Sequence, residues 1–377
     1  MDLPALDADT PHLADVVPSL LAAIGTNGFD NSLRLPEVSS ACVLLIDGLG
    51  GELLEAHTAD APVLHELRAG TLHVGFPSTT VAGLAALGTG ACSGEHGMVG
   101  YSFDLPDTGV MNALRWRVHP FGEDLRERVV PERIQPIPTT FERADGAGVE
   151  VSVISGAVFT RSGLTRAVLR GGRYVGVHAL GDLAASVSEA LVTTSSFCYA
   201  YHSELDMLGH IYGPGSLAWR MQLRQVDRLV ESIVESLPAG ALLAVVADHG
   251  MIELDDSAID ADTCAPLNEG VRAIGGEVRA RHVYADHGAE LDVLAAWRET
   301  LGERAWVVAR EDAIEAGWFG PRVGEHVRSR IGDVVVAARG RSGVLRRSVE
   351  PFESSLRGQH GSLTTAEQLV PLALAFG

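Results

Sequence analysis

Short, uninterrupted apolar runs are the sequence feature that most constrains the fold of this chain. Two of them read Ala-Cys-Val-Leu-Leu-Ile (41–46) and Ala-Leu-Leu-Ala-Val-Val-Ala (241–247), and a third reads Phe-Cys-Tyr-Ala-Tyr (197–201). Strands that are apolar at every position are typical of parallel sheets covered on both faces. Between the last two runs, residues 216–237 carry apolar side chains at helical spacing and end before Pro238. This alternation predicts an α/β fold, a three-layer α/β/α sandwich around a mostly parallel central sheet.

The rest of the chain suggests a core that is interrupted by an insertion. Further candidate strands are 71–75, 150–154, 173–178, 305–309, 332–338 and 369–376. Residues 255–345 are rich in Asp, Glu, Arg and Gly, and we expect an inserted cap subdomain there. The catalytic core would then comprise residues 1–254 and 346–377, which agrees with a chain longer than most single domains. Prolines punctuate residues 101–141, which predicts a second, smaller excursion.

Composition excludes several classes of protein. With 46% hydrophobic and 21% charged residues, the chain is expected to be globular and well buried. A formal net charge of −20 argues against binding to a nucleic-acid duplex. The four cysteines are widely spaced, which indicates neither a zinc ribbon nor a disulfide framework, and Cys42 and Cys198 are expected in the core.

The N-terminal segment 1–9 is acidic and lacks a basic region, and the apolar stretch 16–24 is short and contains Pro18. We therefore expect neither a signal peptide nor a membrane span, and a cytoplasmic location. The sequence leaves the oligomeric state open.

Acidic residues follow each of the three apolar runs. Asp47 and Asp248 come directly after their runs, and Asp206 follows the third. Ligands of parallel α/β sheets gather beyond the carboxyl ends of the strands, so we expect these carboxylates to meet at one edge. An acid directly after a buried strand is costly unless it is paired or bound to a metal. A helix N-cap is the alternative role for Asp47.

Histidines accompany these acids. His249 follows Asp248, and His210 lies four residues after Asp206, on the same face if that segment is helical. Such spacing is a metal-ligand pattern, although a surface salt bridge between Asp206 and His210 is an equal alternative. His360 lies in the loop sequence Gly-Gln-His-Gly-Ser, ahead of a possible capping box that spans residues 364–367.

Two further histidines have simpler interpretations. His96 is expected to be structural. The pair Asp286-His287 lies in the suspected cap and is interpreted as a solvated turn.

Three adjacent hydroxyl residues begin a predicted helix in the sequence Phe-Pro-Ser-Thr-Thr-Val (76–81). Ser78 or Thr79 would serve as the helix cap. The dipole and the free N–H groups at a helix N-terminus also suit an alkoxide nucleophile and a phosphate, and Thr80 is the candidate nucleophile. The chemistry of the residues alone does not choose Thr80 over its two neighbours. Together, these groups suit two metal ions that clamp an in-line displacement at phosphorus.

The order of six motifs resembles the type I phosphodiesterase/nucleotide pyrophosphatase family, within the alkaline phosphatase superfamily. The motifs are Leu-Leu-Ile-Asp47-Gly-Leu, Phe-Pro-Ser-Thr-Thr80, Leu-Gly-Thr-Gly90 through Glu95-His-Gly97, Asp206-x-x-Gly-His210-x-x-Gly-Pro214, Ala-Asp248-His249-Gly-Met and Gly-x-His360-Gly. The resemblance implies an alkaline-phosphatase-like core and two divalent ions. The family implies zinc, and manganese is also compatible with these ligands.

The resemblance also implies a role for each residue. One ion would be held by Asp47, Thr80, Asp248 and His249. The other ion would be held by Asp206, His210 and His360. Thr80 would attack phosphorus and form a phospho-threonine intermediate, which water then hydrolyses.

One motif departs from the family. Nucleotide-cleaving members resemble Phe-Pro-Asn after the nucleophile, where the Asn holds a phosphate oxygen, whereas this chain has Val81-Ala82-Gly83. The backbone N–H groups of Gly83 and its neighbours are the donors that we expect to remain for the substrate.

These implications predict a phosphohydrolase that acts on a small phosphorylated substrate, in the first place as a phosphodiesterase. A phosphomonoesterase, a phosphonate hydrolase or a phosphomutase on the same scaffold is the alternative. A catalytically silent metal-binding protein is a further one. Sulfatases are disfavoured because their nucleophile motif carries an arginine that this chain lacks at the corresponding place.

Overall fold

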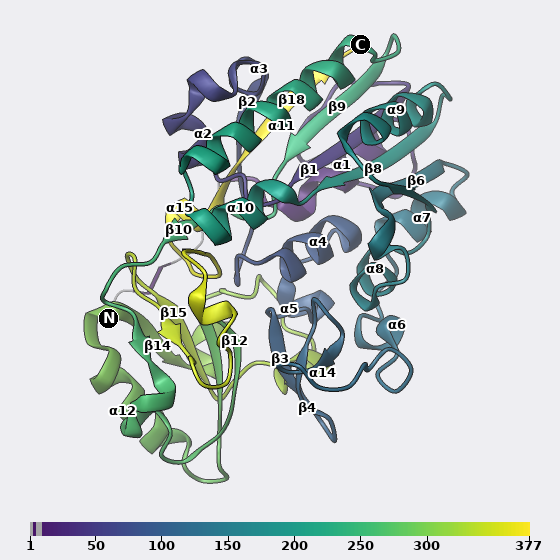
Figure 1. The fold of residues 1–377 in the computed structure, drawn as a ribbon. Coiled ribbons are helices and arrows are strands. Elements are labelled where there is room, and N and C mark those ends of the chain that lie inside the picture. Colours follow the sequence, from purple (N-terminus) through teal and green to yellow (C-terminus); the bar gives the residue numbers. More distant parts are fainter. Residues whose placement is uncertain (1–2, 5–9) are drawn as a thin grey trace.

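A seven-stranded sheet runs through the middle of the molecule (Figure 1). The computed structural model describes residues 3–4 and 10–377, and the strands of this part follow the order β2-β18-β9-β1-β8-β6-β7. Their bounds are β2 (Arg68–His73), β18 (Leu369–Phe376), β9 (Ala241–Val246), β1 (Ser40–Ile46), β8 (Ser196–His202), β6 (Glu150–Gly156) and β7 (Arg173–Val177). Strand β18 is antiparallel to both of its neighbours, and the other printed pairings in this sheet are parallel. The mostly parallel sheet is confirmed.

The register of the three central strands brings their carboxyl ends to one edge. Strand β1 is buried along its whole length, and its last residue, Ile46, pairs with His202 of β8. On the other side, Leu45 pairs with Val246, the last residue of β9. Every side chain of β1 is covered because helices lie on both faces of the sheet.

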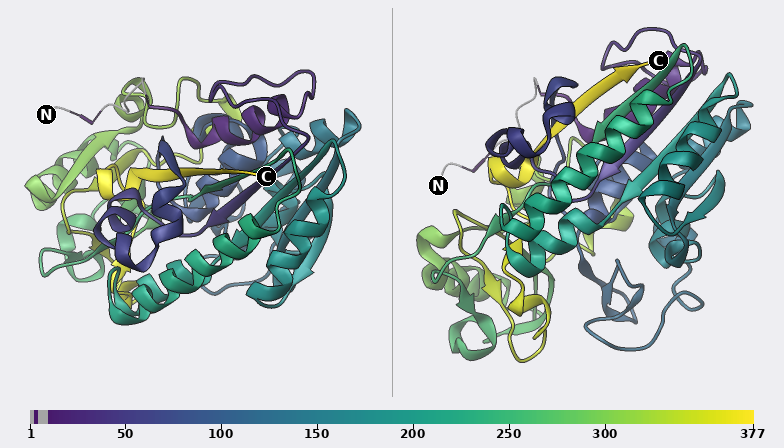
Figure 2. Two further views of the ribbon diagram at one scale, coloured as in Figure 1. Left: turned by 90° about the horizontal axis from the view of Figure 1, so that it is seen from above. Right: turned by 45° about the horizontal axis from the view of Figure 1, so that its top comes forward.

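Helices form a layer on each face of this sheet (Figures 1 and 2). One layer contains α2 (Gly51–Ala56), α3 (Pro62–Glu66), α9 (Leu180–Leu191), α10 (Glu204–Tyr212) and α11 (Leu217–Glu235). The other contains α1 (Val16–Ala23), α4 (Thr80–Thr89), α7 (Thr140–Gly146) and α8 (Gly163–Val168), with α6 (Pro131–Ile134) packed on α8 and α5 (Ser93–His96) on α4. The three-layer α/β/α sandwich is therefore confirmed, and α11 matches the helix predicted between the second and third apolar runs.

A second sheet lies beyond one end of the first (Figure 1). It is antiparallel, in the order β12 (Val271–Glu277), β13 (Ala280–Ala285), β15 (Val334–Ala338) and β14 (Ala305–Ala309). The helices α12 (Glu290–Leu301), α13 (Arg310–Glu315) and α14 (Glu325–Arg328) accompany it. Strands β12 and β13 are absent from the sequence prediction, because glycines and arginines interrupt the apolar pattern of these segments.

The second sheet packs on both of its faces. Val334 and Val336 join a hydrophobic cluster with Trp297 of α12, whereas Val335 and Ala337 join the main core. Successive side chains of β15 point to opposite faces of the sheet, and both faces are buried. Residues 255–345 therefore share their packing with the rest of the protein, and their separation as a cap subdomain stays a prediction.

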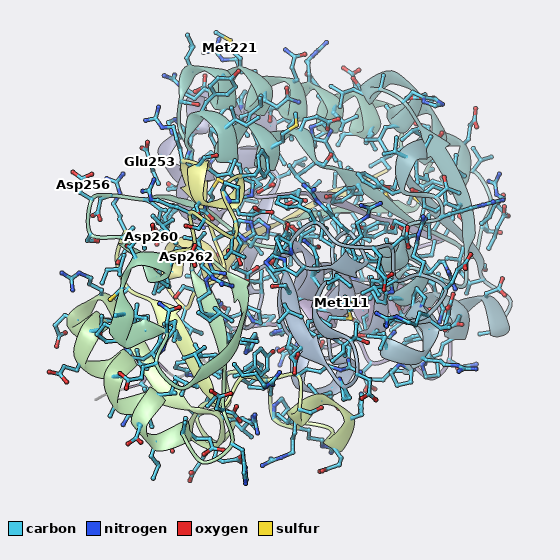
Figure 3. All side chains as sticks on the ribbon, turned by 60° about the horizontal axis from the view of Figure 1, so that its bottom comes forward. Met111, Met221, Glu253, Asp256, Asp260 and Asp262 are labelled. Atoms are coloured by element: carbon cyan, nitrogen blue, oxygen red, sulfur yellow. The ribbon has the colours of Figure 1, made fainter. Side chains whose placement is uncertain are left out.

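The two ends of this segment are held together. Strand β11 (Ile259–Asp260) pairs in parallel with β16 (Val344–Leu345). Asp262, which Figure 3 labels beside Asp260, accepts a hydrogen bond of 3.2 Å from Arg346 Nε. Nearby in the sequence, β10 (Ile252–Glu253) pairs with β17 (Gly358–Gln359), which ends directly before His360.

The smaller excursion forms a sheet of its own. Strands β3 (Ser102–Leu105), β4 (Gly109–Asn112) and β5 (Arg117–Val118) are antiparallel, and Met111 of β4 (Figure 3) is buried.

The capping box expected at residues 364–367 does not form. Although Thr364 is the N-cap of α15 (Thr365–Gln368), its side chain does not cap the helix. The Glu367 carboxylate instead accepts hydrogen bonds from Arg279 and from the backbone N–H of Ser362.

Within the described residues, no helix is both long and apolar enough to cross a membrane. The N-terminal segment, from which we infer no signal peptide, includes residues 1–2 and 5–9, which lie outside the described residues. The cytoplasmic location stays a prediction. All four cysteines are free thiols, and Cys42 and Cys198 are buried, as expected.

Two buried ion pairs tie the second sheet to the C-terminal segment. Arg279, in the β12–β13 turn, contacts both oxygens of Glu367 at 3.0 and 2.6 Å. Arg281 contacts both oxygens of Glu350 at 3.1 and 2.8 Å, and His119 lies 2.8 Å from Glu350 Oε1. Burial alone would raise the pKa of Glu350, but Arg281 and His119 outweigh it and lower the pKa to about 2.

We expect Glu350→Gln to lower the free energy of unfolding by about 3–5 kcal/mol at pH 7, because Arg281 is left buried without its counter-charge. Because the pKa of Glu350 falls on folding, its stabilisation is present above the unfolded value of about 4.3 and is lost as the pH falls toward 2. Urea unfolding from pH 7 to pH 2 measures this. Glu303→Gln is the control, because Glu303 is 94% exposed in its pair with Arg339 and should have little effect. If Glu350→Gln lowered the free energy of unfolding by the same amount at every pH, the buried ion pair would not be the source of the stabilisation.

Candidate metal centre

Three carboxylates meet at the carboxyl edge of the central strands. Asp47 follows β1, Asp248 follows β9, and Asp206 lies in the first turn of α10, just after β8. These carboxylates can approach one another closely because the residue between them, Gly48, has no side chain. Its N–H donates to Asp248 Oδ1 at 3.3 Å, and a Cβ at this position would lie 3.0 Å from Asp206 Cβ. Gly48 also has a φ of +73°, which favours glycine.

The three histidines share one orientation. In each ring Nδ1 lies against a backbone carbonyl, that of Gly358 for His210 (2.7 Å), of Gly250 for His249 (2.9 Å) and of Ser78 for His360 (2.9 Å). A carbonyl only accepts, so each Nδ1 carries the proton and donates it. Each Nε2 then carries a lone pair that faces the site, as in histidines that bind metals.

One group of ligand atoms gathers around His210 and His360. Their Nε2 atoms lie 3.3 Å apart, and Asp206 Oδ2 lies 3.3 Å from His210 Nε2. Asp206 Oδ1 lies 4.0 Å from His360 Nε2. Two lone pairs at this distance repel each other unless a cation lies between them. One ligand atom from each of these three residues falls within 4.8 Å of the others, which fits a metal ion.

A second group gathers around His249. Its Nε2 lies 3.3 Å from Asp47 Oδ1 and 3.8 Å from Asp248 Oδ2. Asp47, Asp206 and His249 also place ligand atoms within 4.8 Å of one another. Asp206 therefore lies within reach of both groups, whereas the sequence placed it in only one. The ring of His249 stacks on that of His360 with centroids 3.5 Å apart, so the two groups are adjacent.

Within the structure described, one oxygen of each carboxylate in the site lacks a hydrogen-bond partner. Asp47 Oδ1, Asp206 Oδ1 and Asp248 Oδ2 are buried without a hydrogen-bond partner in the described part of the chain. Burial and the charge of Asp47 raise the pKa of Asp206 and of Asp248 well above their ordinary values. Burial lowers the pKa of His249, but the three carboxylates outweigh it and raise that pKa to about 10. Bound cations would lower these raised pKa values, since they supply the missing positive charge. The donor set fits two divalent ions.

The three hydroxyl residues before α4 have separate roles. Ser78 Oγ donates to the carbonyl of Ser362 at 2.8 Å and accepts from the N–H of Gly361 at 3.2 Å, so it fixes the loop that carries His360. Thr79 is the N-cap of α4, but its side chain makes no capping hydrogen bond. Thr80 is the hydroxyl that faces the site, with Oγ1 3.3 Å from His249 Nε2.

Gly83 has a role other than the expected one. Its N–H donates to the carbonyl of Thr79 at 2.9 Å, so the helix already uses the group that we expected to bind phosphate. A Cβ at this position would lie 2.5 Å from Asp248 Cβ. Gly83 is therefore required for the close packing of α4 against Asp248, and its role as a substrate donor stays a prediction that the hydrogen bond to Thr79 disfavours.

The other sequence predictions at histidines are simple to place. His96 is fully buried and accepts from the N–H of Met98 at 3.1 Å, which fits a structural role. Asp286 and His287 form an exposed turn, as expected.

Two residues near the site escaped the sequence analysis. The Tyr201 hydroxyl donates to Asp47 Oδ2 and orients that carboxylate. Tyr201 sits in the apolar run 197–201, where its hydroxyl was a signal that the strand faces something polar. Glu277 ends β12 and lines a cavity of about 330 Å³ next to Thr80 and His360. An acid at a strand end was again the signal, but β12 itself was not predicted.

Comparison with known proteins places this geometry in context. The sequence profile described as type I phosphodiesterase/nucleotide pyrophosphatase matches residues 41–363. An inactive variant of murine ectonucleotide pyrophosphatase/phosphodiesterase 5 in complex with AMP has a TM-score of 0.68 and 16% identity, over 88% of this chain and 87% of that one. Phosphonoacetate hydrolase from Sinorhizobium meliloti 1021, in complex with phosphonoformate, has a TM-score of 0.65 and 20% identity, over 90% of each chain. At these identities the likeness shows a shared, alkaline-phosphatase-like fold.

A phosphopentomutase from Anaeromyxobacter dehalogenans (strain 2CP-C) is 30% identical over 171 residues, which are 44% of this chain and 42% of that protein. The chain thus aligns with less than half the length of this relative. The family profile, in contrast, spans all seven residues of the site, and the chain belongs to the type I phosphodiesterase/nucleotide pyrophosphatase family.

Proposed function

We propose that this protein is a metal-dependent phosphodiesterase of the nucleotide pyrophosphatase type, with Thr80 as its nucleophile. The observation that carries the proposal is the position of Thr80 Oγ1. It lies 3.3 Å from His249 Nε2, at the start of a helix and beside two groups of metal ligands. Family membership supports phosphoester chemistry in general. The preference for diesters and the identity of the ions, with zinc first and manganese second, are part of the proposal.

The residues divide into two ion sites that share Asp206. Asp47, Asp248 and His249 would hold one ion next to Thr80. Asp206, His210 and His360 would hold the other. Bound there, divalent ions would act as Lewis acids and favour the alkoxide form of the Thr80 hydroxyl.

The chain itself positions the Thr80 hydroxyl and stabilises negative charge on the phosphoryl oxygens. Thr80 begins α4, whose N-terminus has no side-chain cap in the described structure. Its first N–H groups and the helix dipole favour the negative oxygens of a phosphoryl group. Thr80 Oγ would form a bond to phosphorus as the bond to the leaving alkoxide breaks. The remaining ester group would stay on the phosphorus bound to Thr80, and water would then release the phosphate monoester in a second displacement.

A phosphomutase is the second candidate, favoured by the partial similarity to a phosphopentomutase. A mutase needs the phosphoryl group to pass to another hydroxyl of the sugar instead of to water. Assays with a chromogenic diester, the matching monoester and a pentose phosphate separate these activities. Conversion of the pentose phosphate without release of phosphate, and without diester hydrolysis, would replace the leading proposal.

We expect Thr80→Ala to reduce diester turnover by about a thousand-fold or more, since it removes the attacking oxygen while the other ligands remain. Thr80→Ser should keep part of the activity. Thr89→Ala, at the far end of α4, is the control and should retain turnover. Mass spectrometry of acid-quenched wild-type protein should find the phosphomonoester group that remains after loss of the leaving group on the peptide that contains Thr80. Unchanged turnover in Thr80→Ala would exclude the covalent route.

We expect His210→Ala and His360→Ala to lose the same ion, because their Nε2 atoms are only 3.3 Å apart. Elemental analysis of each purified variant should find about one equivalent of metal fewer than in the wild type. His287→Ala, in the exposed turn, is the matched control and should keep the full content. If the double variant lost twice as much metal as each single variant, the shared site would be wrong.

A further inference from the structure

Glu277 is a buried carboxylate that the proposed reaction does not use. It ends β12, and its side chain packs on the backbone beside His360, because a Cβ on Gly361 would lie 2.8 Å from Glu277 Cγ. Both carboxylate oxygens are buried, and neither has a hydrogen-bond partner of good geometry in the described structure. Burying such a group without a partner costs free energy, so its retention calls for a ligand.

The protein's own cations do not meet this need. Burial raises the pKa of Glu277 to about 7, and the opposing effects of Thr79, Tyr101 and Arg281 are too weak to restore the ordinary value. The guanidinium of Arg281 is already committed to both oxygens of Glu350.

A second carboxylate faces the same cavity. Glu353, in the short 3-10 helix η7 (Glu353–Ser355), accepts a hydrogen bond of 3.0 Å from the Tyr101 hydroxyl through Oε1. Its Oε2 is buried and, in the described part of the chain, has no partner. In addition to Asp206, Glu277 and Glu353 thus bring three carboxylate oxygens that lack partners in the described residues to the cavity of about 330 Å³ lined by Thr80 and His360.

The remaining wall of this cavity is largely apolar. It is formed by Met207, Ile211, Phe352 and Leu356, together with the ring of Tyr101. Carboxylates next to aromatic and aliphatic side chains suit an organic cation, because the charge is balanced while the carbon chain is kept from water. Arg115 also lines the cavity, but it is exposed and its charge is screened by solvent. The net charge of −20 also favours cations over anions.

We propose that this cavity, through Glu277 and Glu353, binds the ammonium group of a phosphoester substrate whose alcohol part is an amino alcohol. This inference rests on the proposed function and specifies its substrate class. The phosphoryl group would lie at Thr80 and the metal centre, and the amine would lie on the side of the second sheet. Residues 255–345 then contribute directly to the choice of substrate.

Two esters that differ in one group test the proposal. 2-Aminoethyl and 2-hydroxyethyl p-nitrophenyl phosphate have the same leaving group and nearly the same size, but only the first carries a positive charge. Wild-type protein should hydrolyse the aminoethyl ester with a kcat/KM at least about ten-fold higher. The ratio should fall toward one in Glu277→Gln and in Glu353→Gln, mainly through KM. Glu299→Gln, an exposed position on α12, is the control and should keep the wild-type ratio.

The outcomes separate this inference from the proposed function. Equal rates in the wild type, a preference for the hydroxyethyl ester, or a preference that survives both glutamine variants would each overturn the ammonium site. A preference for the hydroxyethyl ester would instead show that the carboxylates accept hydrogen bonds from hydroxyl groups. If neither ester is hydrolysed, phosphodiesterase activity fails, and calorimetry with the Thr80→Ala protein decides the inference alone. Tighter binding of the aminoethyl ester would support the ammonium site, and equal binding would reject it.

Discussion

The repulsion between electron-rich atoms that face one another across a few ångströms is the physical constraint on which this site depends. The Nε2 atoms of His210 and His360 lie 3.3 Å apart, and each ring has already given its only proton to a backbone carbonyl. Buried carboxylate oxygens surround them without hydrogen-bond partners in the described residues. In a low-dielectric interior such an arrangement repels itself unless positive charge is added. The site is therefore built for cations.

Backbone contacts hold these groups in place, and those of His210 and His360 join segments that are far apart in the sequence. The carbonyls of Ser78, Gly250 and Gly358 fix the three imidazole rings. Gly48 and Gly83 allow Asp206 and Asp248 to approach closely, where any side chain would collide. Such outer contacts restrict the orientation of the ligands before an ion arrives, which reduces the free energy needed to assemble the site.

The second sheet belongs to the same machinery. Its β12–β13 turn carries Arg279, which is bound to Glu367 just after the loop of His360. The same turn places Glu277 beside Gly361. A shift of this turn would therefore move both a wall of the cavity and the segment that carries a metal ligand. A fold shared with a phosphonoacetate hydrolase and an ectonucleotide pyrophosphatase/phosphodiesterase does not by itself select a substrate, and the proposed ammonium site assigns that selection to the lining of this cavity.

The sequence by itself determined the mostly parallel sheet, and it indicated six acidic and histidine residues, together with Thr80, as candidate site residues at its edge. This was possible because apolar runs 41–46 and 241–247 have a single physical explanation, and because residues that end adjacent parallel strands must be neighbours. Only the tertiary structure decided which hydroxyl faces the site, that Gly83 packs on Asp248, and that Asp206 reaches both ion sites. It also revealed Tyr201 and Glu277. These features depend on contacts between segments that are far apart in the sequence, and no local pattern of side chains records such distances.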